Sequence, residues 1–222
     1  TSWPIDTTAV ARSGAANVSY ERFETVVLNA GQGADTINLQ ATHREQAPPQ
    51  AGKGSTFTVN AGLGDDQINI GSAVAGNALL DTFVLDTGQP TFSSPKGIPV
   101  FINGQGGSDS IVYDNTASAA AASLVFLNES FTDIFPKLPA GVVPAANPDQ
   151  VALFTNVFGA DPSAFQFESL TGGQTGSAQQ VAIRTRGIES ASLLLSQQTA
   201  PTGGVDNVRV ATGTYGHDLT VS

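Results

Sequence analysis

Three aspartates each end nearly the same glycine-rich heptapeptide. "NAGQGAD" ends at Asp35, "NAGLGDD" at Asp66 and "NGQGGSD" at Asp109. If these turns stack like neighbouring strands, the carboxylates lie about 5 Å apart, and each pair repels by roughly 3 kcal/mol at an effective dielectric constant near 20. A divalent cation with oxygen ligands reverses the sign of that interaction. The spacing therefore indicates either a calcium site or a turn in which each aspartate accepts backbone N–H groups.

The residues around each aspartate repeat as well. Glycine is the residue best suited to an arc that passes through positive φ, and two glycines recur in each copy. Asparagines at the entrance of the arcs can bond one another in a ladder of side-chain amides. These asparagines are Asn29, Asn60 and Asn103. The apolar residues two positions after the aspartates are expected to stack in the core, namely Ile37, Ile68, Ile111 and, after a weaker fourth copy "GGVD", Val208.

These copies resemble the Gly-Gly-x-Gly-x-Asp-x-apolar repeat of RTX, or haemolysin-type, calcium-binding proteins. The looser spacing is more similar to large repetitive cell-surface proteins of environmental bacteria. The resemblance implies Ca²⁺ held by aspartate carboxylates and by carbonyls of the arcs. The implied ligands are Asp35, Asp65, Asp66, Asp109 and Asp206, with Gly31, Gly33, Gly62, Gly64, Asn29, Asn60 and Asn103. The first glycine of the family motif is alanine at positions 30 and 61. The copies are also not nine residues apart, and this spacing excludes a tight β-roll.

Short β-branched or aromatic runs carry these motifs, and each stops at Asn or Asp. The stopping residues are Asn29, Asn60, Asp86, Asn103 and Asn128. This pattern predicts an all-β chain, a right-handed parallel β-helix of seven to nine rungs forming a single segment over 1–222. A Phe-rich insertion over 115–167 is predicted to carry one short helix, with Asn147 as its N-cap and Gly159 as its stop.

A longer internal repeat of about 165 residues overlies the motif series. "RFETVVL" at Arg22 is echoed by "GIESASL" at Gly187, and the second copy starts near residue 183. The chain therefore resembles a segment cut from a repetitive protein.

Composition narrows the classes of partner. The net charge is −10, and only nine Lys and Arg residues are present, which argues against nucleic acid. The sequence has no Cys and no Met, which excludes disulfides and thiolate metal sites and leads us to expect a processed product or a piece of a longer chain. No apolar run approaches the roughly 20 residues of a membrane span. We expect a secreted, extracellular or cell-surface location.

An enzyme is the rival class, because parallel β-helices also carry polysaccharide lyases and hydrolases. His43 and His217 lie in corresponding loops of the long repeat, and Arg184 and Arg186 alternate on one strand. None of these forms a catalytic pattern, so we predict no catalytic residues and no enzyme activity. The sequence predicts a structural building unit of an extracellular bacterial assembly. It would contact copies of itself through its ends, and through residues 126–167. The alternative is a polysaccharide-binding or polysaccharide-cleaving protein.

Overall fold

The computed structural model describes the strands and the arcs that join them. The described residues are 2–5, 9–10, 18–19, 25–40, 56–74, 78–82, 84–86, 100–119, 121–130, 166–174, 179–196, 206–211 and 218–222. The short helix expected between Asn147 and Gly159 lies outside them.

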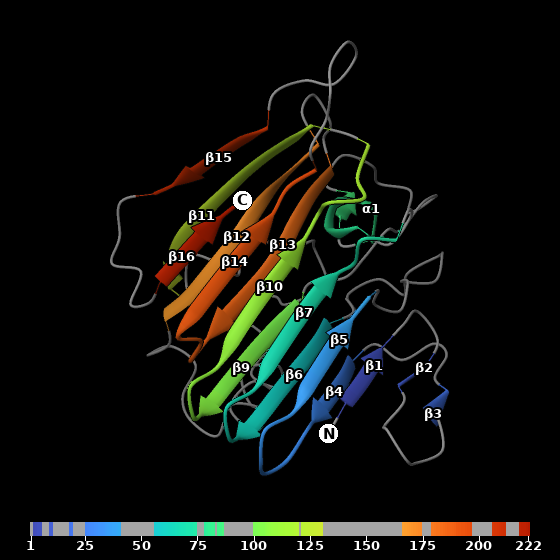
Figure 1. The fold of residues 1–222 in the computed structure, drawn as a ribbon, viewed down its shortest axis with the longest axis vertical. Coiled ribbons are helices and arrows are strands. Elements are labelled where there is room, and N and C mark those ends of the chain that lie inside the picture. The colour runs from blue at the N-terminus through green and yellow to red at the C-terminus, as the bar shows by residue number, and fades with distance from the viewer. Residues whose placement is uncertain are drawn as a thin grey trace, which may run out of the picture.

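The described strands form two eight-stranded sheets (Figure 1). The first sheet has the order β16 (Asp218–Val221), β14 (Ser190–Leu194), β10 (Ser110–Asp114), β7 (Gln67–Gly71), β5 (Thr36–Leu39), β1 (Ser2–Ile5), β2 (Ala9–Val10) and β3 (Val18–Ser19). The second has the order β15 (Asn207–Val210), β11 (Ala122–Ser130), β12 (Gln166–Gln174), β13 (Gln179–Arg186), β9 (Val100–Gly106), β6 (Thr56–Leu63) and β4 (Thr25–Asn29), with β8 (Val84–Asp86) also paired to β13. A four-residue helix, α1 (Leu79–Thr82), follows β7.

Four strand–arc–strand units cross from the second sheet to the first. They are β4–β5, β6–β7, β9–β10 and β13–β14. Equivalent strands of neighbouring units pair in parallel, for example Asn29 with Asn60 and Ile37 with Ile68. The glycine-rich motifs of the first three units form the arcs, so that the same turn recurs beside itself.

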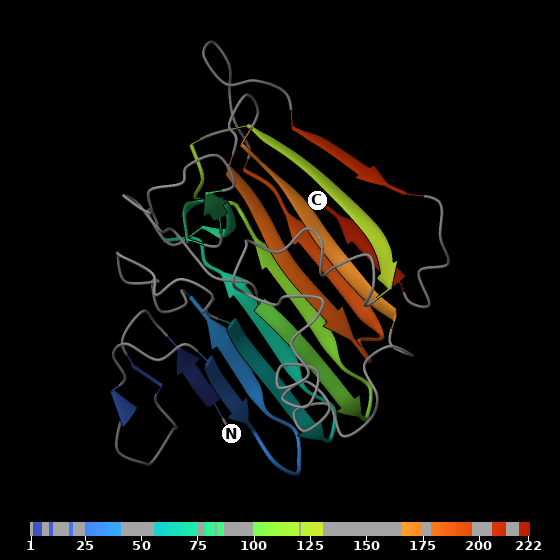
Figure 2. The ribbon, with the colours of Figure 1, turned by 180° about the vertical axis from the view of Figure 1, so that it is seen from behind.

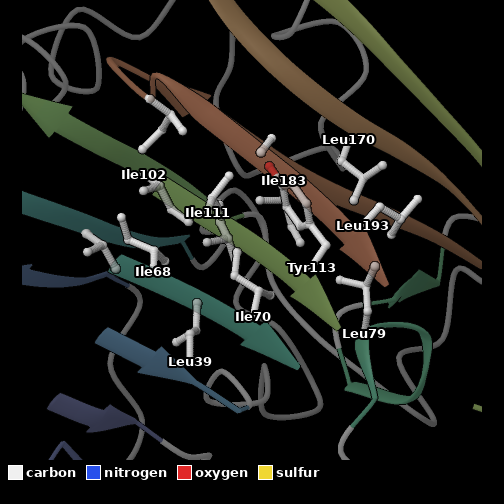
Figure 3. Close-up of a cluster of buried hydrophobic side chains, with 14 of the residues drawn as sticks. Leu39, Ile68, Ile70, Leu79, Ile102, Ile111, Tyr113, Leu170, Ile183 and Leu193 are labelled. Carbon is white, nitrogen blue, oxygen red and sulfur yellow. The ribbon is translucent and has the colours of Figure 1, made fainter. Parts of the chain in front are cut away.

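The core lies between the two sheets (Figure 3). Alternate residues point inward, because successive side chains of a strand project to opposite faces. Ile37, Ile68 and Ile111 are all buried in one row, which confirms their predicted stacking. Val208 does not join this row, because it lies on β15 in the second sheet, beside Leu124.

The prediction of a right-handed parallel β-helix is wrong. The strands form two sheets of mixed direction: β11 pairs antiparallel with β12, β12 with β13, β1 with β2 and β2 with β3. The β11–β12 pairing extends from Ala122 opposite Gln174 to Ser130 opposite Gln166. Inward-outward alternation has a period of two in both strand directions, so the sequence pattern could not separate this antiparallel return from another parallel crossing.

The two copies of the internal sequence repeat, which are 165 residues apart, lie in different sheets. The strand of the first copy, β4, belongs to the second sheet, whereas the strand that follows Gly187, β14, belongs to the first. The repeat therefore aligns residues that alternate alike but face the core from opposite sides.

Candidate functional site

A column of acidic side chains runs along the corner where the arcs enter the first sheet. Asp35, Asp66, Asp109 and Glu189 each precede a strand of that sheet. The N–H of Asp35 donates to Oδ1 of Asp66 at 2.7 Å, and the N–H of Asp66 donates to Oδ1 of Asp109 at 2.9 Å. The N–H of Asp109 donates to Oε2 of Glu189 at 2.6 Å. Each carboxylate therefore caps the backbone of the unit before it.

The backbone of the corner is bonded across the same steps. The carbonyl of Asp35 accepts from the N–H of Gln67, that of Asp66 from Ser110, and that of Asp109 from Glu189, each at 2.9 Å. Each aspartate thus donates its N–H to a carboxylate of the next unit and accepts, at its carbonyl, an N–H from that same unit. Neighbouring units are therefore joined by both a side-chain and a backbone hydrogen bond at this corner. An amide bonded to a carboxylate contributes roughly 1.5–3 kcal/mol, more than a neutral pair.

The column brings negative charges together, and its three aspartates are buried while Glu189 is exposed. Asp66 and Asp109 are 2% and 1% exposed. Burial raises the pKa of Asp66 above its usual range; the N–H of Asp35 opposes the rise, and the charges of Asp35 and Asp65 add to it. Burial raises the pKa of Asp109 to about 6, opposed by the N–H of Asp66 and supported by the charges of Asp66, Glu189 and Asp65. The two carboxyls therefore favour a proton or a cation.

One oxygen in the column is unsatisfied. Within the described part of the chain, the buried Oδ2 of Asp66 has no hydrogen-bond partner. A buried carboxylate oxygen without a donor is costly, because water no longer solvates it. This oxygen has the chemistry to accept a proton or to contact a hard cation.

The asparagines form the predicted ladder. Nδ2 of Asn60 donates to Oδ1 of Asn29 at 2.8 Å, and Nδ2 of Asn103 lies 3.5 Å from Oδ1 of Asn60. These amide oxygens bond along the ladder, which favours the structural role for the asparagines over the implied ligand role. A second ladder, in which Nδ2 of Asn69 donates to Oδ1 of Asn38 at 2.8 Å, was not predicted.

Glycine is required where the arcs touch. Gly62 has φ +112°, and a Cβ there would lie 1.7 Å from the carbonyl oxygen of Gly31. That carbonyl accepts the N–H of Leu63 at 2.9 Å, and Gly64 donates to the carbonyl of Gly106 at 2.8 Å. Gly31 and Gly33 also have positive φ but open space around them. The arcs therefore pair with one another, and the Gly31 carbonyl implied as a ligand already accepts a backbone hydrogen bond.

Two of the predicted aspartates lie away from the column. Oδ1 of Asp206 accepts the N–H of Ala122 at 2.7 Å in the second sheet. Asp65 is exposed, and its Oδ1 accepts the N–H of Ser108 at 2.9 Å. Both repeat the capping geometry without joining the column.

Glu189 is the member of the column that sequence reasoning missed. "ESA" from Glu189 pairs in register with "DSI" from Asp109, and this similarity is the signal that could have identified it. The longer match of "GIESASL" to "RFETVVL" hid the correspondence.

The fit of the corner to a metal ion is partial. The Oδ2 of Asp66 suits a hard cation, whereas the Oδ1 atoms of Asp66 and Asp109 accept backbone hydrogen bonds. Over the described ranges, no group of three or more His, Cys, Asp or Glu side chains is arranged to hold a metal ion.

A separate charged pair is buried on the outer face of the second sheet. Nε of Arg184 lies 3.4 Å from Oε2 of Glu129, and the side chains are 3% and 2% exposed. Burial lowers the pKa of Arg184, and Glu129 opposes that change. Phe101 pairs with Arg184 and Phe167 pairs with Glu129 in the strand register. Their rings meet edge to face, with centroids 6.0 Å apart. Arg184 is thus a packed structural cation rather than an open sugar contact; His43 and His217 lie outside the described residues.

No protein-family model, curated protein or solved structure matches the chain. Among the helices that the structure describes, none is long and apolar enough to cross a membrane.

Proposed function

We propose that the chain is a structural module of an extracellular assembly, and that the acidic column holds its units together. The observation that carries this proposal is the series of hydrogen bonds from Asp35, Asp66 and Asp109 into the carboxylate of the next unit. The carboxylates that could do chemistry accept backbone N–H groups of the preceding unit instead. The arrangement favours a structural role over catalysis, because a catalytic carboxylate must reach a substrate.

The proposal includes a cation at the corner, with Ca²⁺ as the candidate. It is supported by the unsatisfied Oδ2 of Asp66 and by the raised pKa values of Asp66 and Asp109. The ion would neutralise the column and strengthen the contact between the β6–β7 and β9–β10 units. Binding to the folded state alone raises stability by RT ln(1 + [L]/Kd), about 2.7 kcal/mol at a hundredfold excess over Kd.

Thermal unfolding at neutral pH in Ca²⁺ and in chelator tests the cation. We expect Ca²⁺ to raise the Tm of the wild type, and Asp66→Asn to abolish that rise. Asp65→Asn is the matched control: it removes a neighbouring but exposed carboxylate, so the rise should persist. Coincident melts of the wild type in both buffers would remove the cation from the proposal.

Incubation with acidic and neutral polysaccharides tests the structural role. We expect their chain lengths to stay unchanged. Cleavage that survives further purification of the protein would replace the structural proposal with the enzyme alternative.

A further inference from the structure

The two ends of the paired sheets are stepped in opposite senses (Figures 1 and 2). Beyond the β13–β14 unit, the second sheet continues through β12, β11 and β15, whereas among the described strands the first sheet adds only β16. Beyond the β4–β5 unit, the first sheet continues through β1, β2 and β3. The second sheet thus projects at one end of the molecule, and the first sheet projects at the other.

The step beside β15 leaves core-facing side chains uncovered. Val210 is in register with the buried Phe126, and paired residues of neighbouring strands project to the same face. Val210 is nevertheless 51% exposed. On β16, Val221 is in register with the buried Leu193 and is 44% exposed. The apolar interior therefore opens at this end of the module.

Strand direction is suited to continuation of the second sheet. β15 is parallel to β11, β11 runs in the direction of β13 through two antiparallel pairings, and β13, β9, β6 and β4 are parallel. A second β4 placed beside β15 would therefore run parallel to it. The N–H of Ala211 bonds to Phe126, and that of Ala30 bonds to Asn60. Because N–H directions alternate along a strand, the N–H groups of Val210 and Val27 point outward from these edges.

From these features we infer that a second copy of the chain stacks head to tail, with its β4 beside β15 and its β1 and β2 filling the step beyond β16. This inference rests on the proposed function and names the partner of the module. The second sheet leaves a step two strands deep, and the incoming β1 and β2 fill it, so the two-residue β3 must move aside. β1 pairs Trp3 with Ile37 and Ile5 with Leu39, and the incoming β1 would lie opposite β15, where Val210 is 51% exposed.

In the proposed stacking, the β15 edge of one copy pairs with the β4 edge of the next, so a change at either edge should block assembly. Val210→Pro removes an outward N–H and an exposed apolar side chain from β15, and Val27→Pro removes an outward N–H from β4, where the side chain is 37% exposed. Neither change removes a hydrogen bond to the neighbouring strand of the same molecule. Val74→Pro, at an exposed position after β7, is the control. Val210→Lys and Val27→Lys serve if either proline variant fails to fold.

Sedimentation of the full chain over a range of concentrations is the test. We expect the wild type and Val74→Pro to form a ladder of multiples of 22.7 kDa, and each edge variant alone to remain a monomer. An equal mixture of the two edge variants should give dimers and nothing longer, because each supplies the edge that the other lacks. A wild type that stays monomeric at every concentration, or edge variants that assemble like the wild type, would overturn the stacking. Neither result bears on polysaccharide cleavage or on the Ca²⁺ melts, so the proposed function stands or fails separately.

Discussion

Replacement of Asp109 by asparagine should stabilise the protein at neutral pH. The folded-state pKa of about 6 lies above the ordinary value of 3.8, so the folded state binds the proton more tightly than the unfolded chain. A carboxyl of this kind contributes stability that is fully present below about pH 4 and is lost as pH rises through about 6. Wild-type stability in chelator should therefore fall between about pH 4 and pH 6.

The size of the effect follows from the shift. About two pKa units at about 1.4 kcal/mol each amount to roughly 3 kcal/mol. Asparagine keeps an oxygen for the N–H of Asp66, and the shift already includes the stronger bond to the charged acceptor, because that N–H lowers the pKa of Asp109. The gain for Asp109→Asn at pH 7 is then about 3 kcal/mol, or roughly 6 °C in Tm for a chain of this length, and close to zero near pH 4.

Urea unfolding in chelator at the two pH values measures this difference. Asp109→Ala is the matched variant: it removes the acceptor and leaves the N–H of Asp66 buried, so it should be less stable than Asp109→Asn by about 1–3 kcal/mol at both pH values. Equal stability of Asp109→Asn and Asp109→Ala at pH 7, or an Asp109→Asn variant that keeps the pH dependence of the wild type, would refute this prediction.

The remaining predictions concern the buried pair on the second sheet. Arg184→Met should cost about 3–5 kcal/mol in the free energy of unfolding, because it leaves Glu129 charged and buried. The double variant Arg184→Met, Glu129→Leu should recover most of that loss, as measured in the same urea titration; a double variant no more stable than the single one would show that the charge is not the cause.

Local features of the corner could be predicted from the sequence. The repeated Asn, Gly and Asp positions identified the arcs, and the Asn29–Asn60–Asn103 ladder and the Ile37–Ile68–Ile111 row are as predicted. These features depend on short-range spacing, and a repeated turn fixes them. The strand–arc–strand units β4–β5, β6–β7 and β9–β10 follow from the same signal.

Direction and partner choice could not be predicted in the same way. The antiparallel return of β12 on β11 depends on pairing between residues far apart in sequence, and alternation of apolar residues is the same for either direction. Glu189 was missed because its turn lacks the glycine pattern, although its carboxylate occupies the corresponding place. The pKa of Asp109 likewise depends on burial, which spacing alone does not give.

Native-state hydrogen exchange of the amides of Asp35, Asp66 and Asp109 tests the central claim most directly. These N–H groups lie outside the strand pairings and are held by carboxylates of the next unit. If the acidic column closes the module, all three should exchange as slowly as the central amides of β6 and β7, and Asp109→Ala should expose the amide of Asp66 while Asp109→Asn keeps it protected. Fast exchange of all three amides in the wild type, with β6 and β7 protected, would contradict the claim.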